Sequence, residues 1–183
     1  MSLSDGFPHS LQEVFKMNRR ILSAALLTLI LTALPAALFY EQIPAHFPIH
    51  WGFNGIADRW QEKNEFILFM IGVPVFFHAA ALLLPRVDPL GSNYRRFASV
   101  YEFYIILFDI FMLAVFAAVI INAMTHFSFC MDTFILILLG IVFASMGNYM
   151  PLLRRNFFIG IRTPWALQSE ETWNKTHRVA GRC

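Results

Sequence analysis

Four long runs of apolar residues constrain the fold of this 183-residue chain more than any other feature. They cover residues 21–40, 66–84, 103–123 and 133–150. An α-helix needs ~20 residues to cross a hydrocarbon core of ~30 Å, so each run is about long enough. Charged residues make up 14% of the chain, against about a quarter of a typical soluble domain. The sequence therefore predicts an all-α integral membrane protein with four transmembrane helices.

The positions of lysine and arginine predict how these helices are oriented. The two ends of the chain and the loop 85–102 hold twelve of the fourteen, whereas the loops 41–65 and 124–132 hold two. Positive charge accumulates on the cytoplasmic side of a membrane, so we expect both termini in the cytoplasm (N-in/C-in). The expected domains are a cytoplasmic tail (1–20), a transmembrane bundle with an outer loop (21–150) and a cytoplasmic juxtamembrane strip (151–183).

The outer loop 41–65 has the composition of an ordered segment. Pro44 and Pro48 disfavour a helix, and Asn54-Gly55 is a turn dipeptide. Its tryptophans fit an aromatic belt at the membrane surface. The loop is either a structural cap over the bundle or a site for an extracellular peptide or lipid. A metal site is a third alternative, with candidate ligands His46, His50, His126 and Asp58. Their spacing matches no established zinc signature, so we expect no metal.

Two polar residues interrupt the apolar runs, His78 in the second and Asp109 in the third. A carboxylate in hydrocarbon is costly unless it is paired or protonated. The simplest interpretation is an intramembrane pair that pins two helices together. The alternative is a proton or ligand pathway, as in a small transporter or channel-like protein.

The stretch from Gly160 to Arg178 is polar and irregular, unlike the rest of the chain. Gly160 permits a turn, and Thr163 precedes a proline, which favours an extended conformation. Ser169 is a plausible N-cap for a short helix over Trp173–Val179, because two glutamates follow it in the first turn. One interpretation is lipid docking, with the tryptophans in the interface and the basic side chains at anionic headgroups.

This segment also resembles a known family, the SdpI family of bacterial immunity proteins from the sporulation-delay toxin system. The matching positions are Gly147, Asn148, Pro151, Asn156, Gly160, Arg162, Thr163, Pro164, Trp165, Trp173, Thr176, His177, Arg178 and Gly181. The outer loop is similar to a membrane domain of unknown function that often precedes this motif. There the matching positions are Pro44, His50, Gly55, Asp58, Trp60 and Lys63.

The resemblance implies a multi-pass immunity protein of the bacterial plasma membrane that protects against a secreted, membrane-active toxin peptide. In the best-known member, the protein also holds a cytoplasmic repressor at the membrane. By topology, we expect toxin at the outer loop, at His50, Asn54, Gly55, Asp58, Trp60 and Lys63. We expect a repressor at the inner strip, at Asn156, Gly160, Arg162, Thr163, Pro164, Trp165, Trp173, Thr176, His177 and Arg178.

The sequence gives no reason to expect an enzyme. It has no His-Glu-x-x-His zinc motif, no Gly-x-Ser-x-Gly elbow and no Gly-Lys-Ser/Thr phosphate loop. We expect no cofactor and no direct contact with nucleic acid, with membrane lipids as the constant surroundings. The SdpI family normally continues into further membrane helices after this motif, so we expect Cys183 to end either a truncated or a naturally short form.

Overall fold

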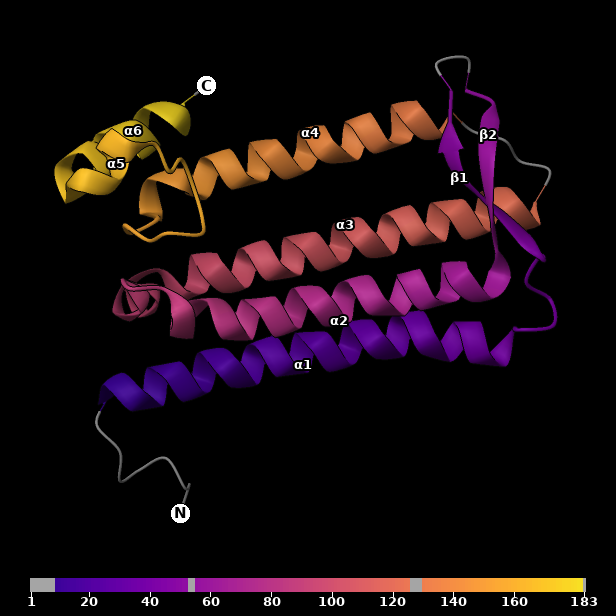
Figure 1. The fold of residues 1–183 in the computed structure, drawn as a ribbon, viewed down its shortest axis with the longest axis horizontal. Helices are drawn as coiled ribbons and strands as arrows, with labels where there is room; N and C mark the ends of the chain where they lie inside the picture. The colour runs from indigo at the N-terminus through magenta and orange to yellow at the C-terminus, as the bar shows by residue number, and fades with distance from the viewer. Residues whose placement is uncertain (1–8, 53–54, 126–129, 183) are drawn as a thin grey trace. The chain divides into compact units, whose positions relative to one another are not determined.

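The computed structural model describes residues 9–52, 55–125 and 130–182, with side chains from Lys16 onward. Within these residues the chain is mostly helical (Figure 1). In chain order, the elements are α1 (His9–Leu38), β1 (His46–Trp51), β2 (Ala57–Glu62), α2 (Lys63–Val87), η1 (Gly91–Phe97), α3 (Ala98–Met124), α4 (Met131–Tyr149), η2 (Met150–Leu152), α5 (Pro164–Gln168) and α6 (Glu170–Ala180).

Four helical stretches of the described chain are long and apolar enough to cross a membrane, as the apolar runs predict. They cover Lys16–Leu38, Lys63–Val87, Gly91–Met124 and Met131–Leu152. Large apolar side chains on these helices are exposed, and Phe76 and Leu68 are examples at 76% and 72%. A surface of this kind suits hydrocarbon, because a monomeric soluble protein rarely exposes so much contiguous apolar surface.

Helix α1 begins at His9, inside the segment expected to be a tail. The residues from His9 to Arg20 contain neither glycine nor proline. Because nothing in this segment breaks a helix, the apolar helix extends into it. Pro35 lies inside α1.

The chain forms two compact units. The first combines residues 1–24, 78–106 and 143–183, and the second combines residues 25–77 and 107–142. In the second unit, the core contains three phenylalanines. The rings of Phe47 and Phe66 stack with centroids 4.3 Å apart, and Phe116 meets Phe66 edge-on at 6.3 Å. Phe47 thereby packs β1 against α2, and Phe66 of α2 packs in turn against Phe116 of α3.

The expectation of an all-α fold with a loop at 41–65 requires a correction. Strands β1 and β2 form an antiparallel hairpin, in which His46 pairs with Glu62 and Trp51 pairs with Ala57. The register shifts between Pro48 and His50. A two-stranded sheet has two open edges, so a proline that donates no hydrogen bond is tolerated there. Gly55 near the hairpin turn has a φ of +72°, and Asn54 lies outside the described residues.

Candidate functional site

The C-terminal motif, residues 150–182, includes two short helices, α5 and α6, whose first turns are capped by side chains. Thr163 is extended, with φ −69° and ψ 152°, and its hydroxyl accepts a hydrogen bond from Ala166 N at the start of α5. Ser169 caps α6 in the same way by accepting from Thr172 N. The predicted extended Thr163 and the predicted Ser169 cap are both confirmed. These caps satisfy backbone donors that helix ends otherwise leave without partners.

Asn156 closes the turn that precedes α5. Its side chain is fully buried, and its amide nitrogen donates to the carbonyl oxygens of Arg154 and Ile159 at 2.9 and 3.0 Å. Its amide oxygen accepts from the backbone nitrogens of Phe158 and Ile159 at 2.9 and 2.6 Å. Both ends of the amide are therefore used within the motif, which makes Asn156 a structural residue of the turn.

Trp173 and His177 form the core of the motif, and both are fully buried. Their rings stack with centroids 4.0 Å apart and planes inclined by 22°. The indole N–H of Trp173 donates to the carbonyl oxygen of Leu153 at 3.0 Å. The interpretation that Trp173 lies in the lipid interface is therefore wrong, because its indole is enclosed by the motif itself.

The hydrogen bonds of His177 fix its protonation. The backbone N–H of Ile161 donates to Nε2 at 3.0 Å, and Nδ1 lies 2.9 Å from the carbonyl oxygen of Trp173. Nε2 must be an acceptor and Nδ1 a donor, so the ring is neutral. Burial lowers the pKa of His177 below its usual value, against a smaller opposing effect of the hydrogen bond to Trp173.

Two glycines are required where the motif is most tightly packed. Gly160 has a φ of +103°, and a Cβ there would lie 2.3 Å from Nε2 of His177. At Gly181, after α6, a Cβ would lie 2.8 Å from the carbonyl oxygen of Gly147 in α4. Both positions therefore exclude a side chain, and the second lets the end of α6 approach the end of α4.

The motif is attached to the segment between α2 and α3. The carboxylate of Asp88 is buried and accepts from Phe157 N at 2.9 Å, from Leu90 N at 2.7 Å and from the Tyr94 hydroxyl at 3.2 Å. Asn93 adds a hydrogen bond from its amide to the carbonyl oxygen of Arg155 at 2.8 Å. Sequence analysis missed Asp88, although an Asp-Pro pair directly after an apolar run is a turn signal.

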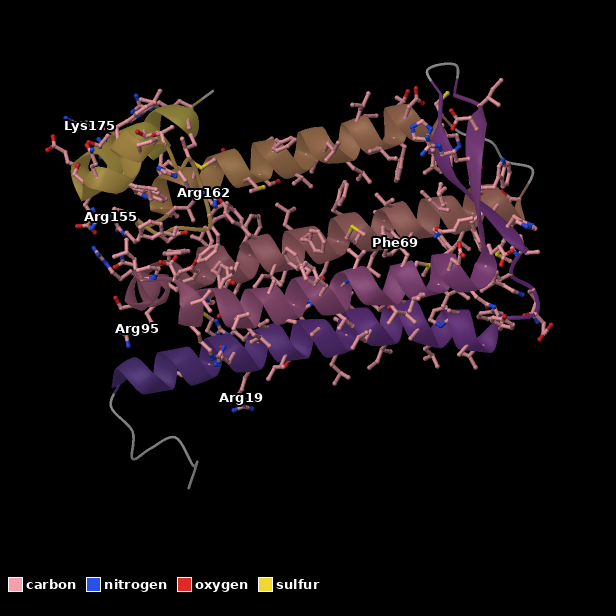
Figure 2. All side chains as sticks on the ribbon, viewed as in Figure 1. Arg19, Phe69, Arg95, Arg155, Arg162 and Lys175 are labelled. Atoms are coloured by element: carbon pink, nitrogen blue, oxygen red, sulfur yellow. The ribbon has the colours of Figure 1, made fainter. Side chains whose placement is uncertain are left out.

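The residues of this motif that were expected to contact a repressor divide into two groups by solvent exposure. Asn156, Trp173 and His177 are buried, and Thr163 and Thr176 are partly buried. The exposed residues are Gly160, Arg162, Pro164, Trp165 and Arg178. Trp165 is 61% exposed, and Arg162 donates to the carbonyl oxygen of Phe157 at 3.0 Å. Figure 2 shows Arg162 in the loop before α5 and Lys175 on α6. The second group presents most of the surface that another molecule can touch, whereas Asn156, Trp173 and His177 present none.

The hairpin is the second candidate site. Nδ1 of His50 lies 2.6 Å from Oδ1 of Asp58 on the neighbouring strand, and both side chains are more than half exposed. Trp60 is 59% exposed. Lys63 lies 4.0 Å above the Tyr40 ring and donates to the Tyr40 carbonyl oxygen at 3.0 Å. In the described part of the chain, no three His, Cys, Asp or Glu side chains gather as metal ligands; His126 lies outside that part.

His78 in α2 and Asp109 in α3 are both buried, at 3% and 5% exposed. They belong to different compact units, so their pairing stays a prediction.

Both candidate sites lie in segments of the chain that match known protein families. Residues 153–183, which include most of the C-terminal motif, match the SdpI/YfhL protein family. Residues 26–73, which include the hairpin, match a domain of unknown function (DUF1648). The resemblance to the SdpI family is confirmed.

A curated relative extends the resemblance to SdpI over most of the chain. The Immunity protein SdpI of Bacillus subtilis (strain 168) is 25% identical over 166 residues, which cover 91% of this chain and 76% of the relative. No solved structure matches the chain. Together with the four apolar helices, the resemblance to SdpI makes the chain a multi-pass bacterial membrane protein.

Proposed function

We propose that this chain is a membrane immunity protein of the SdpI type, which protects its cell from a secreted, membrane-active toxin peptide. One observation carries the proposal. The similarity to the Immunity protein SdpI extends over 91% of the chain, so it includes both the helices and the C-terminal motif. A match limited to the C-terminal motif would show only that the two proteins have this segment in common.

In the proposed orientation, both termini are cytoplasmic. The lysines and arginines support it, since twelve of fourteen belong to the terminal segments and the loop between α2 and α3. The C-terminal motif then faces the cytoplasm, and the hairpin faces outward. Fusing a reporter that is active only in the cytoplasm to Arg182 tests this directly, because an outward terminus would leave the reporter silent.

We assign toxin contact to the hairpin, at His50, Asn54, Gly55, Asp58, Trp60 and Lys63. The exposed Trp60 indole supports this assignment, because tryptophan contributes large contact area at interfaces. The pair of His50 and Asp58 adds polar groups on neighbouring strands. Lys63, which directly follows β2, donates to the carbonyl oxygen of Tyr40 just after α1, so it also holds the hairpin in position for this contact.

We assign contact with a cytoplasmic repressor to the exposed residues Gly160, Arg162, Pro164, Trp165 and Arg178. The buried Asn156, Trp173 and His177 hold this surface in place, with Thr163 and Thr176 beside them. A repressor held at the membrane cannot reach its operator, so the same protein would report the presence of toxin. This role rests on the immunity function, and the two are separable by experiment.

The test is survival under toxin challenge. A sensitive bacterium expressing the full chain is exposed to the membrane-active peptide encoded near its gene and compared with cells carrying an empty vector. The proposal expects survival only with the chain. Equal killing of both strains, with the chain verified in the membrane fraction, would overturn it.

A further inference from the structure

A polar pocket is lined by residues of α1, of η1 and of the first turns of α3. It measures about 280 Å³ and is lined by Lys16, Arg20, Arg95, Arg96, Ser99 and Glu102. Arg20 pairs with Glu102 at 2.8 Å, and Arg96 pairs with Glu170 of α6 at 2.9 Å. With Glu170 included, four cationic side chains of the described residues meet two carboxylates at this pocket, which favours an anionic ligand.

An apolar groove adjoins this pocket. It measures about 290 Å³, and its walls are Ile21, Ala24, Ile105 and Ile106 together with Arg20 and Glu102. Arg20 and Glu102 therefore line both spaces, with their ion pair at the boundary. All of these residues belong to the first compact unit. The combined site has a cationic end and a hydrocarbon end, as an amphiphile requires.

The cationic end of the site lies at the depth of the lipid headgroups. Lys16 and Arg20 lie just before the apolar run that begins at residue 21, and Arg95 and Arg96 lie before the run that begins at residue 103. The cations therefore lie at the level of the headgroups, and the groove residues Ile105 and Ile106 lie further along the apolar stretch. Basic side chains at this level attract anionic lipids.

We propose that this site binds one anionic phospholipid of the phosphatidylglycerol type. Lys16, Arg95 and Arg96 contact the phosphate, the Ser99 hydroxyl donates to it, and one acyl chain lies along the isoleucine groove. A zwitterionic lipid brings an ammonium group toward the same cations and binds more weakly. A free phosphate ester fills only the polar pocket. Because Arg96 also pairs with Glu170, the bound headgroup lies beside the C-terminal motif.

The test measures which lipids stay with the full-length protein purified in a mild detergent. Native mass spectrometry after equal addition of phosphatidylglycerol and phosphatidylcholine gives the retained ratio. The double variant Lys16→Gln/Arg95→Gln should lose about 30-fold in phosphatidylglycerol binding, since each of the two basic residues contributes about 1 kcal/mol at a membrane surface and about 1.4 kcal/mol corresponds to tenfold. Phosphatidylcholine retention should not change.

A matched double variant controls for charge and folding. Arg19→Gln/Arg182→Gln removes the same charge from two exposed residues that do not line the pocket, and Figure 2 shows Arg19 pointing away from α2 and α3. It should retain phosphatidylglycerol, and so should Arg95→Lys. An equal loss in both double variants would overturn the site in favour of a general charge effect. Displacement of the lipid by an equal concentration of glycerol phosphate would overturn the role of the groove.

Discussion

The backbone N–H of Phe157 donates to the carboxylate of Asp88 at 2.9 Å, which joins two positions 69 residues apart in the chain. Asp88 also accepts from Leu90 N and from the Tyr94 hydroxyl. The C-terminal motif is therefore attached to the turn after α2 by one buried side chain, and it is more than a tail that follows the last membrane helix.

Asp88→Ala should detach the motif from this turn. The change leaves the three donors without their acceptor, and each buried donor without a partner costs about 1–3 kcal/mol. We expect faster cleavage after Arg155 and Arg162 by a small amount of trypsin. Asp88→Asn keeps one carbonyl oxygen as an acceptor and should show a smaller effect. Cleavage of Asp88→Ala at the wild-type rate would show that the attachment does not depend on this carboxylate.

Gly160→Ala should destabilise the motif. The methyl group would lie 2.3 Å from Nε2 of His177 at a φ of +103°, and a residue held in a sparsely populated conformation costs about 1–3 kcal/mol before any steric clash is added. A lower melting temperature of the purified protein is the expected result. Gly140→Ala is the matched control, because a Cβ at Gly140 meets nothing within 4 Å. Equal melting temperatures for the two variants would contradict the packing described for His177.

Acid should weaken the motif through His177. Its pKa in the folded protein is lowered by burial from the usual 6.5, so the unfolded state binds the proton more readily. Stability is then complete above pH 6.5 and falls as the pH drops through the window below that value. Hydrogen exchange of residues 160–178 should accelerate between pH 7.5 and pH 5.5, after correction for the intrinsic rates. His177→Gln keeps an acceptor for Ile161 N and should lose this acceleration; if the acceleration persists, another group titrates.

Trp60→Ala and Asp58→Ala in the hairpin should each reduce protection against toxin, if the hairpin is where toxin binds. Both side chains are more than half exposed, so their loss should leave protein levels unchanged. Ile56→Ala removes another exposed side chain, at 65%, from outside the assigned residues. A loss of about tenfold in the tolerated toxin concentration, confined to the first two variants, corresponds to about 1.4 kcal/mol of binding. Full protection by both would remove the hairpin from the mechanism.

The membrane-crossing helices could be predicted from the sequence because hydrocarbon thickness fixes their length. The hairpin could not. Its strands carry Pro48 and an irregular pattern instead of strict alternation, and β1 is held partly by Phe47 packing against Phe66. Strand formation depends strongly on such tertiary packing, which a single sequence does not display.

In the C-terminal motif, the helix caps could be predicted from the sequence, whereas the burial of its aromatic side chains could not. The caps at Thr163 and Ser169 act over three residues, so residue type and order reveal them. Trp173 reaches Leu153, 20 positions away, and the attachment to Asp88 spans an even longer interval. Trp173 and His177 were therefore expected on a binding surface, and they form its interior instead.

The central claim is that the chain protects its cell from toxin, and that the exposed surface of the C-terminal motif, where Trp165 is 61% exposed, binds the repressor. The most direct measurement follows survival and the membrane-bound fraction of the repressor in toxin-challenged cells that carry an empty vector, wild type, Trp165→Ala or Val179→Ala, with the three chains at equal membrane levels. Val179, at 63% exposed, is the control from the same motif. The account predicts survival with all three chains and loss of membrane-bound repressor with Trp165→Ala alone. Killing of the wild-type cells at the rate seen with the empty vector would contradict it.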